Sequence, residues 1–250
     1  MKPIENKPLT PMKDLKLNVA EQRHLDLTKS DVEIPDLEKK LMEVLSTVSK
    51  MKGVIVAGGR GEDNHVMANI TPSKKKDKVL IFPEPNPVLI YFNSGLEHIQ
   101  NTIAIRKDIL KSEYEPEELY PIFSDFYKQA FQGITQLIMA MESLFNQKIP
   151  EDVNLEFDGQ NLNKGNIEWK DFKIKIRHIV PLLTGTDLYA EHNADYQNIC
   201  NLNKLRNSLI HLKSLREDNF THYQSLCKEL IDFDYETNCN SIRNVILLLK

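Results

Sequence analysis

Helical periodicity is the feature that most constrains the fold. From about Asn86 to the end of the chain, apolar residues recur at intervals of three and four positions, which places them on one face of an α-helix. The pattern predicts helices over residues 88–111, 118–147, 169–180, 193–216, 220–233 and 239–250. The polar segment 151–165 is rich in Asn, Asp and Gly and is expected to be a loop. Long helices joined by modest loops predict an all-α antiparallel helical bundle over residues 86–250.

The first ninety residues have a different composition. They hold eight of the twelve prolines, and four of the nine glycines fall between Gly53 and Gly61. Spacing predicts one helix over residues 36–52 and a short strand over 53–57, while the lysines of segment 74–78 indicate a solvated connector. We therefore expect residues 1–80 to form a small N-terminal appendage of mixed or irregular structure.

Bulk composition narrows the class of protein. The 250 residues are 41% hydrophobic and 27% charged, as in ordinary globular proteins. A net charge of -4 argues against nonspecific coating of nucleic acid, although a local basic site remains open. The apolar runs are far shorter than the about 20 residues that span a bilayer, and the first residues lack the apolar run of a secretory signal. Three cysteines without metal-ligand spacing fit a reducing cytoplasm, so we expect a cytoplasmic protein without membrane segments.

One predicted helix near the C-terminal end carries residues suited to phosphate chemistry. Its core-facing stripe is formed by Leu202, Leu205, Leu209 and Leu212. Asn207 and His211 lie one turn apart on the opposite side, while Arg206 and Ile210 lie on the flank. A guanidinium can hold a phosphate with two parallel donors, and histidine can move a proton near neutral pH. Ile210 outside the stripe indicates that the flank meets a second surface. If this second surface is the same helix of another copy, a two-fold interface brings two arginines and two histidines into one cleft. We therefore expect a homodimer.

The segment Arg206-Asn207-Ser208-Leu209-Ile210-His211 resembles the motif of the HEPN family, in which an arginine and a following polar residue precede a histidine. The end of the preceding long helix, residues 140–146, is also similar, and the resemblance covers about residues 86–250. Many HEPN members are metal-independent ribonucleases of toxin–antitoxin and antiphage systems that act as dimers, and others are inactive binding or scaffold modules. The resemblance implies Arg206, Asn207 and His211 as catalytic residues and single-stranded RNA as substrate. It implies no metal or cofactor, and it leaves open an antitoxin or regulatory partner.

The same arginine-to-histidine spacing also occurs from Arg60 to His65 and from Arg216 to His222. The first pair lies in a glycine-rich loop and the second crosses an expected helix break, so helical context favours Arg206 and His211. Two functions remain open: an endoribonuclease, and a catalytically silent helical module that binds RNA, a nucleotide or a protein.

The segment 169–177 admits two interpretations. Trp169 with Lys170, Lys173, Lys175 and Arg177 combines aromatic and basic residues as an RNA groove would, yet an amphipathic helix with its tryptophan toward the core explains them equally well.

Glu142 and Asn146 share one helix face and are candidates for a supporting layer near the motif. Glu191, His192 and Asp195 contain metal-ligating types, but no second histidine follows at helical spacing, so a helix start is the better account.

Overall fold

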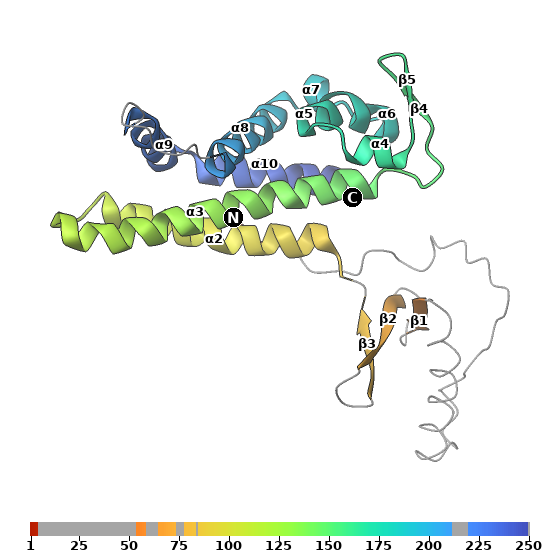
Figure 1. Cartoon of the computed structure of the whole chain (residues 1–250), viewed down its shortest axis with the longest axis horizontal. Coiled ribbons are helices and arrows are strands. Elements are labelled where there is room, and N and C mark those ends of the chain that lie inside the picture. The colour runs from red at the N-terminus through yellow and green to blue at the C-terminus, as the bar shows by residue number, and fades with distance from the viewer. Residues whose placement is uncertain (5–53, 59–64, 74–77, 84, 212–219, 250) are drawn as a thin grey trace. The chain divides into compact units, whose positions relative to one another are not determined.

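The structure, a computed structural model, describes residues 1–4, 54–58, 65–73, 78–83, 85–211 and 220–249. Contacts divide the chain into two compact units, one made of Met1–Glu5 with Pro87–Lys250 and the other of Asn6–Asn86. The larger unit is mostly helical, as its periodicity predicts, and the smaller one contains a β-sheet (Figure 1).

Two long helices, α2 and α3, form one layer of the helical unit, where they lie side by side (Figure 1). Helix α8 packs on α3 and on α10, which also contacts α2. The helices are α2 (Pro87–Ile109), α3 (Pro116–Gln147), α4 (Lys164–Glu168), α5 (Phe172–Ile174), the π-helix η2 (Lys175–Ile179), α6 (Val180–Thr184), α7 (Leu188–Glu191), α8 (Asn193–Ile210), α9 (Phe220–Asp232) and α10 (Tyr235–Leu248).

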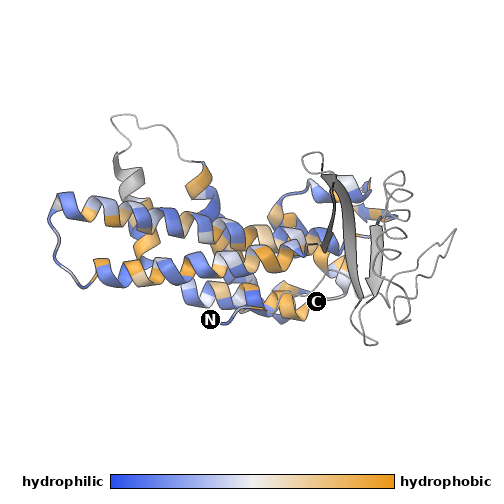
Figure 2. Ribbon diagram, turned by 90° about the horizontal axis from the view of Figure 1, so that it is seen from below, coloured by the Kyte–Doolittle hydropathy of each residue, from blue (hydrophilic) through white to orange (hydrophobic). Residues whose placement is uncertain are grey.

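The core between α2 and α3 contains an unusually close helix contact at two glycines. Hydrophobic and hydrophilic residues alternate along both helices (Figure 2), and the face of α3 that includes Ile134 and Leu137 is fully buried. A Cβ added to Gly133 would lie 2.7 Å from Cδ1 of Ile99, and one added to Gly95 would lie 3.1 Å from the backbone N of Leu137. The absence of side chains at these positions therefore sets how closely the two helices approach.

The last helix begins earlier than its periodicity predicts. Helix α10 starts at Tyr235 rather than Cys239, because Asp234 caps it: its side chain accepts a hydrogen bond from the backbone N–H of Thr237 at 3.1 Å. Tyr235 is buried and its hydroxyl donates to the carbonyl oxygen of Leu230 at 2.8 Å. The turn between α9 and α10 is thus fixed by polar contacts that apolar spacing does not report.

The segment 151–165, predicted to be a loop, contains a short β-hairpin. Strand β4 (Leu155–Phe157) pairs antiparallel with β5 (Gln160–Leu162). The two connecting residues, Asp158 and Gly159, have φ angles of 53° and 69°, the backbone form that a tight hairpin turn requires and that Asp-Gly adopts readily. Leu162 is buried in a small cluster with Ile149, Ile167 and Ile179. The loop prediction was wrong here because polar composition outweighed the Asp-Gly turn signal.

The second unit contains a three-stranded antiparallel sheet in the order β1-β2-β3. Its strands are β1 (Val54–Gly58), β2 (His65–Ser73) and β3 (Lys78–Pro83). Strand β1 is offset by one residue from the predicted strand over 53–57, while β2 and β3 were not anticipated. Proline is rare inside strands, yet Pro72 lies within β2 and Pro83 ends β3. The predicted helix over 36–52 lies outside the described residues.

The first residues of the chain pack on the helical unit. The backbone N–H of Ile4 donates to Oδ1 of Asn93 at 3.0 Å, and Nδ2 of Asn93 donates to the carbonyl oxygen of Ile4 at 2.8 Å. The Ile4 side chain is 6% exposed and belongs to the main core. The prediction that residues 1–80 form a separate appendage did not include this contact of the first four residues with the helical unit.

Candidate functional site

Helix α8 presents the predicted motif with its apolar stripe inward. The three stripe residues that lie within the described part of the chain, Leu202, Leu205 and Leu209, are at most 2% exposed. Leu212 lies outside the described residues. Asn203, which the stripe does not include, is also buried. The burial of the stripe leaves the residues on the other faces of α8 available for a site.

Arg206 is half-buried on the flank of α8. Its Nη1 donates to Oδ1 of the neighbouring Asn207 at 3.0 Å, while its Nε is buried without a hydrogen-bond partner. No carboxylate among the described residues forms an ion pair with it. Buried donors in proteins are nearly always satisfied, so this unpaired N–H is an exception that keeps its capacity to bond an acceptor. Asn207 therefore orients this guanidinium, and no acid in the described part of the chain neutralises it.

His211 lies at the end of α8 rather than inside it. The helix was predicted to continue to Arg216, but it ends at Ile210, and His211 follows as the C-cap with φ -97° and ψ 40°. Its backbone N–H still bonds the carbonyl oxygen of Asn207 at 3.0 Å, and its side chain is exposed. Ile210 is 41% exposed. The histidine is therefore accessible, and an apolar side chain lies beside it on the surface.

The helix does not by itself bring Arg206 and His211 together. Five residues at about 100° each place them roughly 140° apart around the axis. Asn207 lies between them, adjacent to Arg206 and one turn before His211. A phosphate held by Arg206 of one chain would therefore reach a histidine most directly from a second copy of the motif.

Glu142 and Asn146, considered as support for the motif, face a different group. Oδ1 of Asn146 accepts a hydrogen bond from Nζ of Lys175 at 3.1 Å, and the same amine donates to the carbonyl oxygen of Glu168 at 2.5 Å. Lys175 is 4% exposed. Burial lowers the pKa of its amine, while Glu142 and Glu168 act in the opposite direction. The described contacts of Asn146 thus join α3 to η2 and to the end of α4, not to Arg206.

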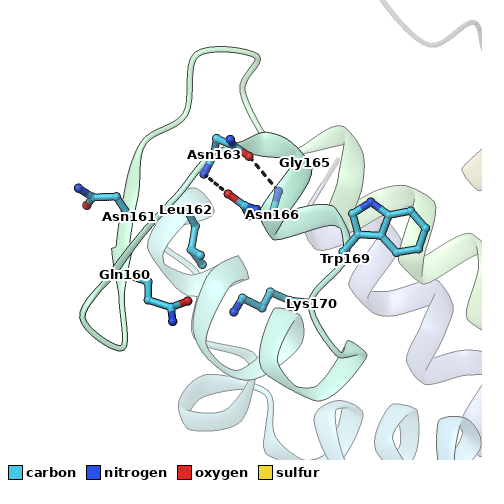
Figure 3. A pocket seen from close by; sticks show the side chains of 8 residues that line it. All are labelled: Gln160, Asn161, Leu162, Asn163, Gly165, Asn166, Trp169 and Lys170. Carbon is cyan, nitrogen blue, oxygen red and sulfur yellow. Dashed lines mark hydrogen bonds between the residues drawn. The ribbon is translucent and has the colours of Figure 1, made fainter.

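The aromatic and basic residues of segment 169–177 separate in the structure. Trp169 is 91% exposed, so the interpretation that placed it toward the core was wrong. The guanidinium of Arg177 lies 3.4 Å from the ring centroid of Tyr189 and pairs with Asp187, which gives it a structural role. Lys170 lines a surface hollow together with Trp169 (Figure 3). Sequence spacing did not distinguish these roles, because it does not show what covers each face.

Comparison with protein-family models, with curated proteins and with solved structures gave no match. Within the described ranges, no group of three or more His, Cys, Asp or Glu side chains is arranged to hold a metal ion. No helix in that part of the chain is both long and apolar enough to cross a membrane.

Proposed function

We propose that the protein is a metal-independent endoribonuclease of the toxin or antiphage-defence type, which cleaves single-stranded RNA at an Arg206-Asn207-His211 site in a homodimer interface. One observation carries the proposal. The Arg206 guanidinium is held by Asn207, keeps an unpaired buried donor and has no acidic partner among the described residues, and an exposed histidine follows five residues later at the end of the same helix. This arrangement suits a phosphodiester and agrees with the resemblance to HEPN ribonucleases.

The proposed chemistry uses the ribose as its own nucleophile. His211 of one chain removes the proton of a 2′-hydroxyl, and the resulting oxygen attacks the adjacent phosphorus. Arg206 stabilises the added negative charge, and Asn207 orients the guanidinium. The bond from phosphorus to the 5′-oxygen breaks, and His211 of the partner subunit protonates that oxygen. The products are a 2′,3′-cyclic phosphate and a 5′-hydroxyl.

The test incubates the purified protein with RNA in excess EDTA and analyses the product ends. His211→Ala is expected to lower the rate by about 10²–10⁴-fold. Arg206→Lys should also impair cleavage, because a point charge does not reproduce the guanidinium geometry. Deoxyribose at the cut site should abolish the reaction because it removes the nucleophile.

Matched variants separate loss of chemistry from loss of fold. Arg243 on α10 is half-buried with an unpaired buried Nε, as Arg206 is, and His178 is exposed, as His211 is. Arg243→Ala and His178→Ala should therefore retain cleavage. Activity that survives His211→Ala would refute the proposed site.

The second candidate is an inactive helical module in which Arg206 and His211 only line a groove for RNA, a nucleotide or a protein such as an antitoxin. The net charge of -4 favours it over the ribonuclease, since an acidic chain gathers RNA substrate poorly, and this argument is strongest for a module that binds a protein. Absence of cleavage of any RNA, together with retained binding that depends on Arg206, would identify this function. Expression of the wild type and of His211→Ala in cells separates the two candidates quickly, because only an active ribonuclease should be toxic in a His211-dependent way.

A further inference from the structure

Trp169 lies on the turn between α4 and α5, and hydrogen bonds fix this turn at both ends. It caps the end of α4, and its backbone N–H contacts the carbonyl oxygen of Gly165 at 3.4 Å. The next residue bonds back to Ile167, which is fully buried, and Asp171 caps the start of α5 by accepting from the N–H of Lys173 at 2.8 Å. The Lys175 amine also fixes this turn through the carbonyl oxygen of Glu168. An indole that is 91% exposed on such a fixed turn is a preformed contact surface.

The hollow beside this indole is lined by amides and one cation. It is an open surface hollow of about 590 Å³, within the size range of small-ligand sites. Gln160 from β5 and Lys170 point toward each other across it, while Trp169 borders it on the opposite side from Gln160 and points its indole outward (Figure 3). Asn163 and Asn166 use their Oδ1 atoms to cap α4, and their Nδ2 groups bond no other described residue. The hollow thus offers hydrogen-bond donors beside an aromatic face.

Charge distinguishes the ligand that fits. No Asp or Glu lines the hollow, and Lys170 forms no ion pair with any described carboxylate. A neutral sugar has no group that needs this cation, and an apolar protein side chain has no use for the surrounding amides. A nucleotide uses all three features, since its base stacks on an aromatic ring, the base edge bonds amides and its phosphate pairs with lysine.

We propose that this hollow, bordered by Trp169, Gln160 and Lys170, binds one unpaired nucleotide of a single-stranded RNA. It is a second contact for RNA, distinct from the Arg206–His211 motif. The choice of RNA over single-stranded DNA rests on the proposed function, whereas the base, amide and phosphate chemistry rests on the hollow itself.

The only tryptophan of the chain is at this site, which makes its fluorescence a local probe. The full-length Arg206→Ala/His211→Ala variant is used, because it removes both cleavage and binding at the motif. It is titrated with octamers of uridylate and of adenylate. Saturable quenching is expected. Binding to a fluorescently labelled octamer, measured by anisotropy, should weaken about 5- to 150-fold with Trp169→Ala and much less with Trp169→Phe, which keeps a stacking ring. Tyr120→Ala, which removes a 76%-exposed ring on α3, should change nothing.

The cation is tested by salt dependence. Lys170→Ala should reduce the slope of log K against log salt by about 0.7, while Lys107→Ala, at an exposed lysine on α2, should leave the slope unchanged. A deoxyribose octamer that quenches Trp169 with the same affinity as the RNA octamer would overturn the assignment of RNA as the ligand. Quenching by a neutral oligosaccharide and by no octamer would overturn the assignment of a nucleotide. An unquenched Trp169 with every octamer would also refute the site. Wild-type cleavage measured in parallel keeps this outcome separate from a failure of the proposed function.

Discussion

Gly133→Ala tests the close contact between α2 and α3. The added Cβ would lie 2.7 Å from Cδ1 and 2.9 Å from Cγ1 of Ile99, and 3.1 Å from its backbone N. The side chain of Ile99 is fully buried, so it has no open space to enter. Overpacking of this kind costs about 1–3 kcal/mol. Alanine in a helix is also about 1 kcal/mol more favourable than glycine, which offsets part of the loss.

A matched variant removes the helix-propensity term. Gly165 also lies in a helix, and a Cβ added there meets nothing closer than Oδ1 of Asn163 at 3.6 Å. The free energy of unfolding of Gly133→Ala should therefore lie about 1–3 kcal/mol below that of Gly165→Ala. Urea unfolding followed by circular dichroism, with the midpoint and slope fitted together, measures the difference.

A second substitution identifies the atom responsible. Ile99→Val removes Cδ1, the atom nearest to the new methyl group, and costs about 0.5–1.5 kcal/mol alone. In the Gly133→Ala background the same change should cost less or stabilise the protein, because it relieves the contact. Equal stability of Gly133→Ala and Gly165→Ala, or strictly additive effects of Gly133→Ala and Ile99→Val, would refute the reasoning.

Three further predictions concern capping, thiol reactivity and assembly. Asp234→Ala should lower the free energy of unfolding by about 0.5–2 kcal/mol at neutral pH. Hydrogen bonds from Thr237 hold the pKa of Asp234 below its ordinary 3.8, so this contribution is present above that value and disappears as pH falls through the lower native pKa. Urea titrations of both proteins from pH 7 to pH 2 should converge, and a constant difference would contradict the assignment. Cys239 is 1% exposed and burial raises its pKa to about 12, so an alkylating reagent at pH 8 should modify it only in urea, as peptide mass spectrometry would show. Ile210→Asp should shift sedimentation toward the monomer, while phosphate should strengthen the wild-type dimer by joining the two copies of Arg206; a wild-type monomer at micromolar concentration with and without phosphate would contradict the dimer.

The helices were the part of the fold that sequence could predict. Apolar spacing is a local property, and it correctly identified the long helices and the buried face of α8 that contains Leu202, Leu205 and Leu209. Helix ends depend on single polar contacts instead. The cap at Asp234 moved one helix start by four residues, and α8 stopped before the predicted residue.

The surroundings of individual side chains could not be predicted in the same way. Lys175 and Trp169 lie in one short basic segment, yet one is buried and the other is exposed. The amine of Lys175 donates a hydrogen bond to Asn146, which is 29 residues away in sequence, and no spacing rule relates the two. The hairpin at Asp158-Gly159 does have a sequence signal, because Asp-Gly favours a tight turn, but the polar composition of the segment predicted a loop instead. For the Arg206–His211 motif, sequence indicated the helix face, and the structure added the unpaired Nε of the arginine.

The contact between Ile4 and Asn93 changes the topological description of the second unit. Because the chain touches α2 before and after residues 6–86, that unit is an insertion within the helical unit rather than an appendage at its end. Ile4 bonds to Asn93, six residues beyond the start of α2 at Pro87, so both junctions lie within about 9 Å measured along the helix axis. A linker of roughly four or five residues would span such a gap. The helical unit can therefore be engineered as a continuous chain from which the insertion has been excised, with its N-terminal anchor retained.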